Sequence, residues 1–288
     1  MTGTRTGEDA GRAPIRGVVL DLDGTVYLSG RPLPGAVDTV AALRARGIGV
    51  VFVSNNPLVP SSTYAQRLTG MGIPADDEDV LTSGGLTAAW LREHHPGSRI
   101  LLVSEPSLRG ELERVGCELT EDPADADVVV VSFDRTFDYA KWKAAFDALR
   151  AGARFVATNP DATCPTADGE LPDCAGIIAA LEATAGVPLD LVVGKPSPVA
   201  ALAALNRLSE QVGARLRPDE VVAVGDRLQT DVRLGRDAGF RTALLLSGVT
   251  GPAQLAASEI VPDDVLDGIG GLAQLLDRPS VEQGARPS

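Results

Sequence analysis

Short, continuous runs of apolar residues recur along this chain, and longer stretches with helical periodicity separate them. Most of the runs lack the apolar–polar alternation of a strand with one solvated face, so each is expected to be a strand buried on both faces. Strands of this kind form parallel sheets that are covered by helices on both sides. The runs occupy residues 17–20, 50–53, 100–103, 128–131, 155–157, 191–193, 221–224 and 243–246.

The stretches between these runs predict helices, and glycine follows several of them, as it does where a left-handed residue caps a helix. Repeated alternation of strand and helix favours right-handed crossovers. The expected fold class is therefore α/β, with a doubly wound, Rossmann-like parallel sheet. The clearest helical stretches cover residues 36–46, 139–150, 177–184, 199–208 and 230–238.

Composition excludes several classes of protein. The formal net charge is −13, and so acidic a chain is repelled by nucleic acid and by anionic membrane surfaces. No apolar run is long enough for a transmembrane helix. Cys117, Cys164 and Cys174 are odd in number and show no CxxC spacing, which is typical of a reducing compartment and predicts a cytoplasmic location. We expect Cys164 and Cys174 to serve as packing residues.

Polar residues follow four of the apolar runs. In open parallel sheets, ligands bind beyond the carboxyl ends of the strands. A turn or a helix cap is the ordinary explanation of each group taken alone, but their joint occurrence predicts a single site. The residues are Asp21, Asp23, Ser54, Asn55, Lys195, Asp226 and Asp231.

These residue types suit phosphoryl transfer, which depends on positioning and on charge stabilisation. Asp21 and Asp226 can supply the hard oxygen ligands that Mg²⁺ prefers, and Lys195 offers a compact cation for phosphate oxygens. Ser54 can donate its hydroxyl. A carboxylate nucleophile divides the reaction into two displacements. A second carboxyl two residues later, Asp23, can protonate the leaving group and then activate water.

The same residues resemble the four motifs of the haloacid dehalogenase (HAD) superfamily. The motif DxDGT matches residues 21–25, and GDxxxxD matches residues 225–231. The resemblance implies that Asp21 is the nucleophile and a metal ligand, and that Asp23 is the general acid/base and binds metal through its backbone carbonyl.

The resemblance also implies roles for the remaining residues. Ser54, Asn55 and Lys195 would hold the phosphate, and Lys195 would also serve in catalysis. Asp226 would be a metal ligand. Asp231 would not bind the ion itself but would contact its ligands, or reach the ion through a water molecule. The implied cofactor is Mg²⁺.

About 140 residues separate Ser54 from Lys195 and contain their own strand–helix series. This insertion resembles the α/β cap (type C2) of the NagD-like, subfamily IIA phosphatases, which include 4-nitrophenylphosphatase-like enzymes. The expected organisation is a HAD-like core at 15–84 and 187–278 and a cap at 85–186. We expect disordered ends at 1–14 and 279–288. Asn159 and Asp161 lie where the cap resembles the family pattern, and are candidates for contacts with the leaving group.

The expected function is Mg²⁺-dependent hydrolysis of a small phosphomonoester through an aspartyl-phosphate on Asp21. Candidate substrates are sugar phosphates, nucleoside monophosphates, phosphoglycolate and glycerol phosphate, and a homodimer through the cap is a further expectation. The alternatives are a catalytically weak phosphometabolite-binding protein and another phosphotransferase of the family. Asp23 argues against halide displacement, which needs no general acid, and the position of the insertion argues against a mutase.

Overall fold

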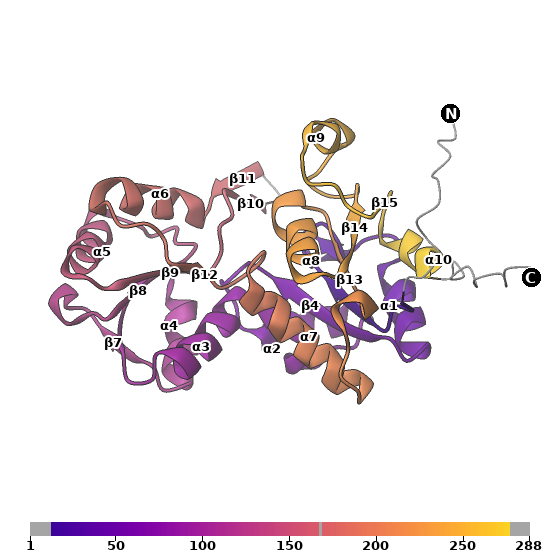
Figure 1. Cartoon of the computed structure of the whole chain (residues 1–288), viewed down its shortest axis with the longest axis horizontal. Coiled ribbons are helices and arrows are strands. Elements are labelled where there is room, and N and C mark those ends of the chain that lie inside the picture. Colours follow the sequence, from indigo (N-terminus) through magenta and orange to yellow (C-terminus); the bar gives the residue numbers. More distant parts are fainter. Residues whose placement is uncertain (1–12, 167–168, 277–288) are drawn as a thin grey trace, which may run out of the picture.

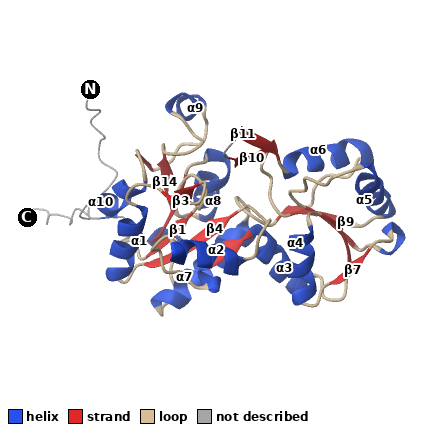
Figure 2. Ribbon diagram, turned by 180° about the vertical axis from the view of Figure 1, so that it is seen from behind, coloured by secondary structure: helices blue, strands red, loops and turns tan. Residues whose placement is uncertain are grey.

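Two parallel sheets, one in each of two lobes, organise the computed structural model, which describes residues 13–166 and 169–276 (Figures 1 and 2). The larger sheet has the order β15-β14-β13-β1-β4-β5, and every neighbouring pair in it is parallel. Its strands are β1 (Gly17–Leu20), β4 (Gly49–Ser54), β5 (Val80–Thr82), β13 (Val221–Gly225), β14 (Arg241–Leu245) and β15 (Asp264–Leu266).

The smaller sheet, in the inserted lobe, is also parallel throughout and has the order β12-β9-β8-β6-β7. Its strands are β6 (Arg99–Val103), β7 (Glu118–Thr120), β8 (Val128–Val131), β9 (Arg154–Ala157) and β12 (Leu191–Val192). Two antiparallel hairpins complete the strands: β2 (Tyr27–Leu28) with β3 (Arg31–Pro32), and β10 (Thr163–Thr166) with β11 (Gly169–Pro172).

Helices cover both sheets. Those of the larger lobe are α1 (Ala36–Ala45), α2 (Ser61–Gly70), α7 (Pro198–Val212), α8 (Arg233–Ala238), α9 (Pro252–Ala257) and α10 (Leu272–Leu276). Those between β5 and β12 are α3 (Ser83–His94), α4 (Pro106–Arg114), α5 (Tyr139–Ala151) and α6 (Cys174–Ala185). Glycine in the left-handed conformation follows α5, α6, α7 and α8 directly.

The central strand β1 shows why its apolar run is continuous. Val18 and Leu20 pack in the cluster that contains α1 and α2, whereas Val19 packs on the opposite face with α7 and α8. Successive side chains of a strand point to opposite faces, so a strand with helices on both sides needs an apolar residue at every position. The predicted α/β fold class is thus confirmed.

The two lobes share a hydrophobic cluster. Val19 of the larger sheet and Val128 of the smaller belong to it, together with Leu86 and Leu91 of α3 and Leu108 of α4. Helix α3 contacts both α4 and α7. The inserted lobe is therefore joined to the larger lobe by buried apolar side chains as well as by the chain connections.

The expected elements are present, and short elements were missed. The predicted boundary at residue 187 lies before β12, although β12 pairs with β9 of the smaller sheet. Sequence periodicity did not indicate the two hairpins, because two- to four-residue strands show no period. Of the ends expected to be disordered, residues 1–12 and 279–288 lie outside the described residues.

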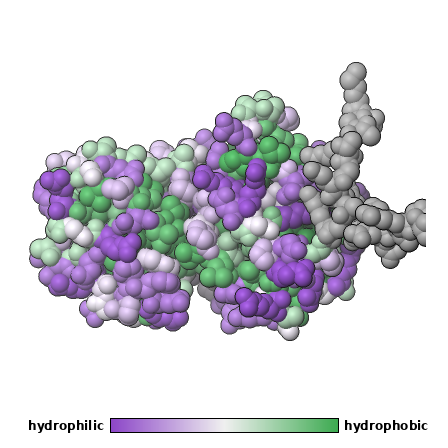
Figure 3. Space-filling model, viewed as in Figure 1, coloured by the Kyte–Doolittle hydropathy of each residue, from purple (hydrophilic) through white to green (hydrophobic). Residues whose placement is uncertain are grey.

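The surface of the face drawn in Figure 3 mixes hydrophilic and hydrophobic residues over both lobes. Among the helices of residues 13–166 and 169–276, none has the length and apolar character needed to cross a membrane.

Candidate active site

The sequence-predicted site residues assemble at the carboxyl edge of the larger sheet. Because β1 lies between β13 and β4, the residues that follow these strands emerge side by side. Asp21 and Asp23 follow β1, Ser54 ends β4, and Asp226 follows β13. Lys195 lies between β12, the last strand of the smaller sheet, and α7, which packs on β1 and β4.

Lys195 joins two of the carboxylates. Its Nζ donates to Asp21 Oδ1 at 2.5 Å and to Asp231 Oδ1 at 2.7 Å. The residue is 3% exposed. Burial alone would lower the pKa of Lys195, but the charges of Asp21 and Asp231 outweigh it and raise the pKa above its ordinary value. Lys195 is therefore a permanent cation beside the Asp21 carboxylate.

Three acids of this edge form a cluster that could hold a metal ion. One oxygen each from Asp21, Asp226 and Asp231 lies within 4.8 Å of the others. Burial raises the pKa of Asp226, and the neighbouring charge of Asp21 raises it further. A cation among these oxygens would relieve this repulsion.

The hydrogen bonds of the cluster distinguish its members. Asp226 Oδ2 accepts from the Val249 N–H at 2.7 Å, but Oδ1 is buried and has no partner among the described residues. Both oxygens of Asp231 are occupied, by Lys195 and by the Arg227 N–H at 3.0 Å. A buried oxygen without a partner is unfavourable, and a hard cation would satisfy it. The donor set thus fits Mg²⁺, with Asp226 open to it and Asp231 committed to Lys195.

Two glycines let the backbone come close to Asp226. Gly24 has φ +88°, a left-handed conformation that favours glycine. A Cβ at Gly24 would lie 2.4 Å from Asp226 Oδ2, and one at Gly248 would lie 1.9 Å from the same oxygen. The DxDGT and GDxxxxD motifs are therefore packed directly against each other.

Asp23 lies beside Asp21 in a largely buried position. Burial raises its pKa to about 6, and the charge of Asp21 adds to the effect, while Lys195 opposes it. A carboxyl group with this pKa can hold a proton close to neutral pH, as a general acid must.

Ser54 and Asn55 fix the loop after β4. Ser54 is 3% exposed, and its Oγ accepts from the Asn56 N–H at 3.2 Å. The Asn55 side-chain amide makes two hydrogen bonds with the backbone of Lys195. It accepts from the Lys195 N–H at 2.8 Å and donates to the Lys195 carbonyl at 2.9 Å. The phosphate-binding candidates are thus held in one arrangement with Lys195.

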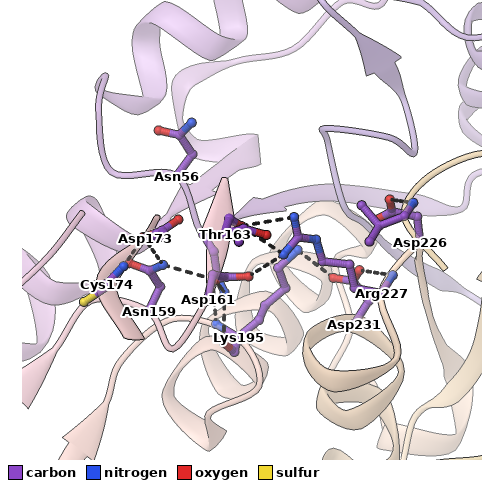
Figure 4. A network of polar contacts seen from close by, with 12 residues as sticks. Asn56, Asn159, Asp161, Thr163, Asp173, Cys174, Lys195, Asp226, Arg227 and Asp231 are labelled. Carbon is purple, nitrogen blue, oxygen red and sulfur yellow. Dashed lines mark hydrogen bonds and ion pairs between the residues drawn. The ribbon is translucent and has the colours of Figure 1, made fainter. Parts of the chain in front are cut away.

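The candidate cap residues Asn159 and Asp161 differ in their positions (Figure 4). Asn159 is completely buried, and its Nδ2 donates at 3.1 Å to both Asp161 Oδ2 and Asp173 Oδ1. Asp161 lines a cavity, but it also accepts from Asn55 at 2.7 Å and from Arg227 at 3.1 Å. Asn159 therefore lies behind the cavity wall, and Asp161 connects the two lobes.

A cavity of about 80 Å³ is lined by Asp21 and Asp23 and by residues of the inserted lobe. Sequence reasoning missed half of its lining, although Arg227 directly follows the GDxxxxD acid Asp226 and could have been found there. The missed lining residues are Asn56, Thr163, Cys164, Asp173, Arg227 and Thr230.

The cysteines of the inserted lobe differ in setting. Cys174 is buried in the core of that lobe, in line with the packing role expected for it. Cys164 lines the cavity, and burial, together with the charge of Asp173, raises its pKa to about 11. Its thiol is therefore protonated at neutral pH and unsuited to nucleophilic chemistry.

Comparison with known proteins agrees with this geometry. A family model described as haloacid dehalogenase-like hydrolase matches residues 18–118, and a HAD-hydrolase-like model matches residues 192–272. The sugar-phosphatase AraL of Bacillus subtilis is 35% identical over 262 residues, which cover 91% of this chain and 93% of that protein.

Solved structures give the same result. The 4-nitrophenylphosphatase from Thermotoga maritima superposes with a TM-score of 0.81 at 37% identity, covering 90% of this chain and 97% of that one. The glycerol phosphate phosphatase from Mycobacterium tuberculosis, solved in complex with magnesium, has a TM-score of 0.78 at 31% identity, covering 93% and 78%.

Proposed function

The chain belongs to the haloacid dehalogenase-like hydrolases, in their NagD-like branch, and on this basis we propose a Mg²⁺-dependent phosphatase that acts on a small phosphomonoester through Asp21. That the chain is a phosphoric monoester hydrolase follows from its relatives. The observation that carries the finer proposal is the contact of Lys195 with Asp21, beside the buried, partnerless oxygen of Asp226.

In the first step, an Asp21 carboxylate oxygen attacks phosphorus while the bond from phosphorus to the leaving oxygen breaks. Asp23 gives its proton to that oxygen, so the leaving group departs as an alcohol. Lys195, fixed by Asp231, stabilises the phosphoryl oxygens. The raised pKa of Asp23 supports this assignment.

In the second step, the Asp23 carboxylate takes a proton from water, whose oxygen attacks phosphorus while the bond to Asp21 breaks. Inorganic phosphate leaves, and Asp21 and Asp23 return to their starting states. Ser54 and Asn55 hold the phosphoryl group through both steps.

Asp21 and Asp226 would hold Mg²⁺, with the Asp23 backbone carbonyl as a third protein ligand. When bound, the ion supplies positive charge that offsets the negative charge of the phosphoryl group. The M. tuberculosis relative was solved in complex with magnesium, which supports Mg²⁺ as the ion. Asp231 would not bind the ion directly, because its two oxygens already accept hydrogen bonds from Lys195 and Arg227.

We further propose that residues 85–186 form a C2-type cap, in which Asp161 ties the cap to the core and Asn159 supports Asp161. The cytoplasmic location and the homodimer through the cap stay predictions. Sugar-phosphatase and glycerol phosphate phosphatase relatives favour a small phosphorylated metabolite as substrate.

The test is phosphate release from a panel of phosphomonoesters, with Mg²⁺ and after chelation. Asp21→Asn should abolish turnover, and Asp23→Asn should lower kcat on the order of 10²–10⁴-fold. Asp38→Asn, on the exposed surface of α1, is the matched control and should retain wild-type activity. Substantial activity of Asp21→Asn would rule out the covalent mechanism.

A further inference from the structure

One carboxylate in the cavity has no role in the proposed mechanism. Asp173 lines the same cavity as Asp21 and Asp23. It is the residue before α6, and its Oδ1 accepts from the Cys174 N–H at 2.5 Å and from Asn159 Nδ2 at 3.1 Å. Within residues 13–166 and 169–276, its Oδ2 accepts no hydrogen bond. Asp173 therefore has a free acceptor oxygen at the cavity wall.

No cation forms an ion pair with Asp173 in the part of the chain that the structure describes. Two cations line the cavity there, Lys195 and Arg227. Asp21 and Asp231 hold the Lys195 ammonium. The Arg227 guanidinium binds Asp161, and at 3.3 Å the carbonyl of Thr163 (Figure 4).

Asp173 therefore lies at the cavity wall without an ion-pair partner among the described residues. Burial raises its pKa to about 6, against the opposing effect of its two hydrogen bonds and of Arg227. It is thus mainly ionised at pH 7.5.

The cavity is small although it is not enclosed, and its lining favours one kind of leaving group. Its volume of about 80 Å³ is below the roughly 300–1,000 Å³ of typical ligand pockets. None of its described lining residues is aromatic, so a nucleobase would find no ring to stack on. Hydroxyl and amide groups of the lining, on Thr163, Thr230 and Asn56, suit a short chain that carries hydroxyl groups.

We propose that Asp173 is a specificity-determining residue, which selects phosphomonoesters with a small, uncharged, hydroxylated leaving group and rejects those whose leaving group carries a carboxylate. The inference rests on the proposed phosphatase function and adds to it the class of the leaving group. A leaving-group hydroxyl donates to Asp173 Oδ2. A carboxylate at that point has no proton to donate and is repelled by the Asp173 carboxylate, which is itself only 8% exposed.

A matched pair of substrates tests this selection. Glycerol 3-phosphate and 3-phosphoglycerate differ only in a terminal hydroxymethyl group against a carboxylate. We expect wild-type kcat/KM to favour glycerol 3-phosphate by about tenfold or more, since the charge repulsion acts on one substrate only. Asp173→Asn removes the charge with little change of shape, and should reduce this ratio about tenfold.

Two further variants control for folding and for helix capping. Asp173→Ser also keeps a capping residue and should reduce the ratio like Asp173→Asn. Asp138 is the N-cap of α5, where it accepts from the Lys141 N–H at 2.9 Å, and it lies outside the cavity lining. Asp138→Asn therefore makes the same change of charge at a cap of the same lobe, and should leave the ratio unchanged.

The outcomes separate the selection from the proposed function. Wild-type hydrolysis of 4-nitrophenyl phosphate that disappears in Asp21→Asn upholds the function, whatever the ratio is. With that activity in place, equal wild-type use of the two matched substrates overturns the selection, even if no Asp173 variant folds. An equal ratio in wild type and Asp173→Asn also overturns it. Absence of phosphate release from every substrate overturns both.

Discussion

Asp161 and Arg227 form an ion pair across the junction of the two lobes, with Asp161 Oδ1 3.1 Å from Arg227 Nη1. They lie 66 positions apart in the chain, and their side chains are only 9% and 22% exposed. The other Asp161 oxygen accepts from Asn55 at 2.7 Å. One carboxylate of the inserted lobe thus joins the loops that follow β4 and β13.

The effects of replacing Asp161 and Arg227 on kcat/KM should depend on each other. We expect Asp161→Asn and Arg227→Gln each to lower kcat/KM by at least tenfold, because a largely buried charge is left without its partner and the Asn55 loop loses a support. The free-energy loss of the double variant should be smaller than the sum of the losses of the two single variants, with a coupling energy of about 1–2 kcal/mol. A double-mutant cycle on kcat/KM and on urea unfolding measures it.

The Asp134–Lys141 pair is the matched control, since it lies within the inserted lobe and Asp134 Oδ2 is 2.6 Å from Lys141 Nζ. Its cycle should show coupling in stability and none in kcat/KM. Strict additivity of the Asp161 and Arg227 losses would contradict the proposed connection.

The buried Asp226 Oδ1 predicts that Mg²⁺ stabilises the folded protein. A cation that binds only the folded state raises the midpoint of thermal unfolding in proportion to the logarithm of its concentration above Kd. Asp226→Asn keeps an acceptor for the Val249 N–H but loses the charged ligand, so the shift with Mg²⁺ should largely disappear. Differential scanning fluorimetry across a Mg²⁺ titration measures this. Asp237→Asn, at an exposed ion pair on α8, should keep the full shift.

Gly24→Ala should disturb the site through both its backbone and its neighbour. The positive φ alone costs about 1 kcal/mol for a residue with a Cβ, and the new methyl group would also push Asp226 away. Gly47→Ala is the control, because Gly47 has φ +72° and no atom within 4 Å of a Cβ. We expect Gly24→Ala to lose more stability than Gly47→Ala in urea unfolding. We also expect its thermal unfolding midpoint no longer to rise with Mg²⁺. Equal losses would show that contact with Asp226 is unimportant.

Glu111 makes stability depend on pH. It is 4% exposed, and burial raises its pKa to about 7 from the ordinary 4.5, although Arg114 opposes the shift. Between these pH values the folded state binds more protons than the unfolded state, so the free energy of unfolding falls as pH rises through the window.

Removing this charge should therefore stabilise the protein at high pH only. We expect the free energy of unfolding of Glu111→Gln to exceed that of the wild type at pH 8 by on the order of 3 kcal/mol, and to show no advantage at pH 4.5. Urea unfolding at the two pH values measures the difference. An advantage of the same size at both would show that ionisation of Glu111 is not its cause.

The core of the site could be predicted because its residues occur in short local patterns. Asp21 and Asp23 follow a strand directly, and so does Asp226, so the strand order alone brings them together at one edge. Asp173 could not be found in this way. It precedes a helix, where aspartate is an ordinary cap, and nothing local shows that the residue lines the cavity.

The sequence by itself determined the α/β architecture, and it predicted the insertion after the second motif and the residues proposed to carry the chemistry, because burial on two faces and strand-end motifs are local properties. The tertiary structure alone decided that Asp161 pairs with Arg227 and that, among the residues the structure describes, no cation pairs with Asp173. Such partners are far apart in the chain, and only the packing of one lobe on the other fixes which charges meet and which stay exposed to the substrate.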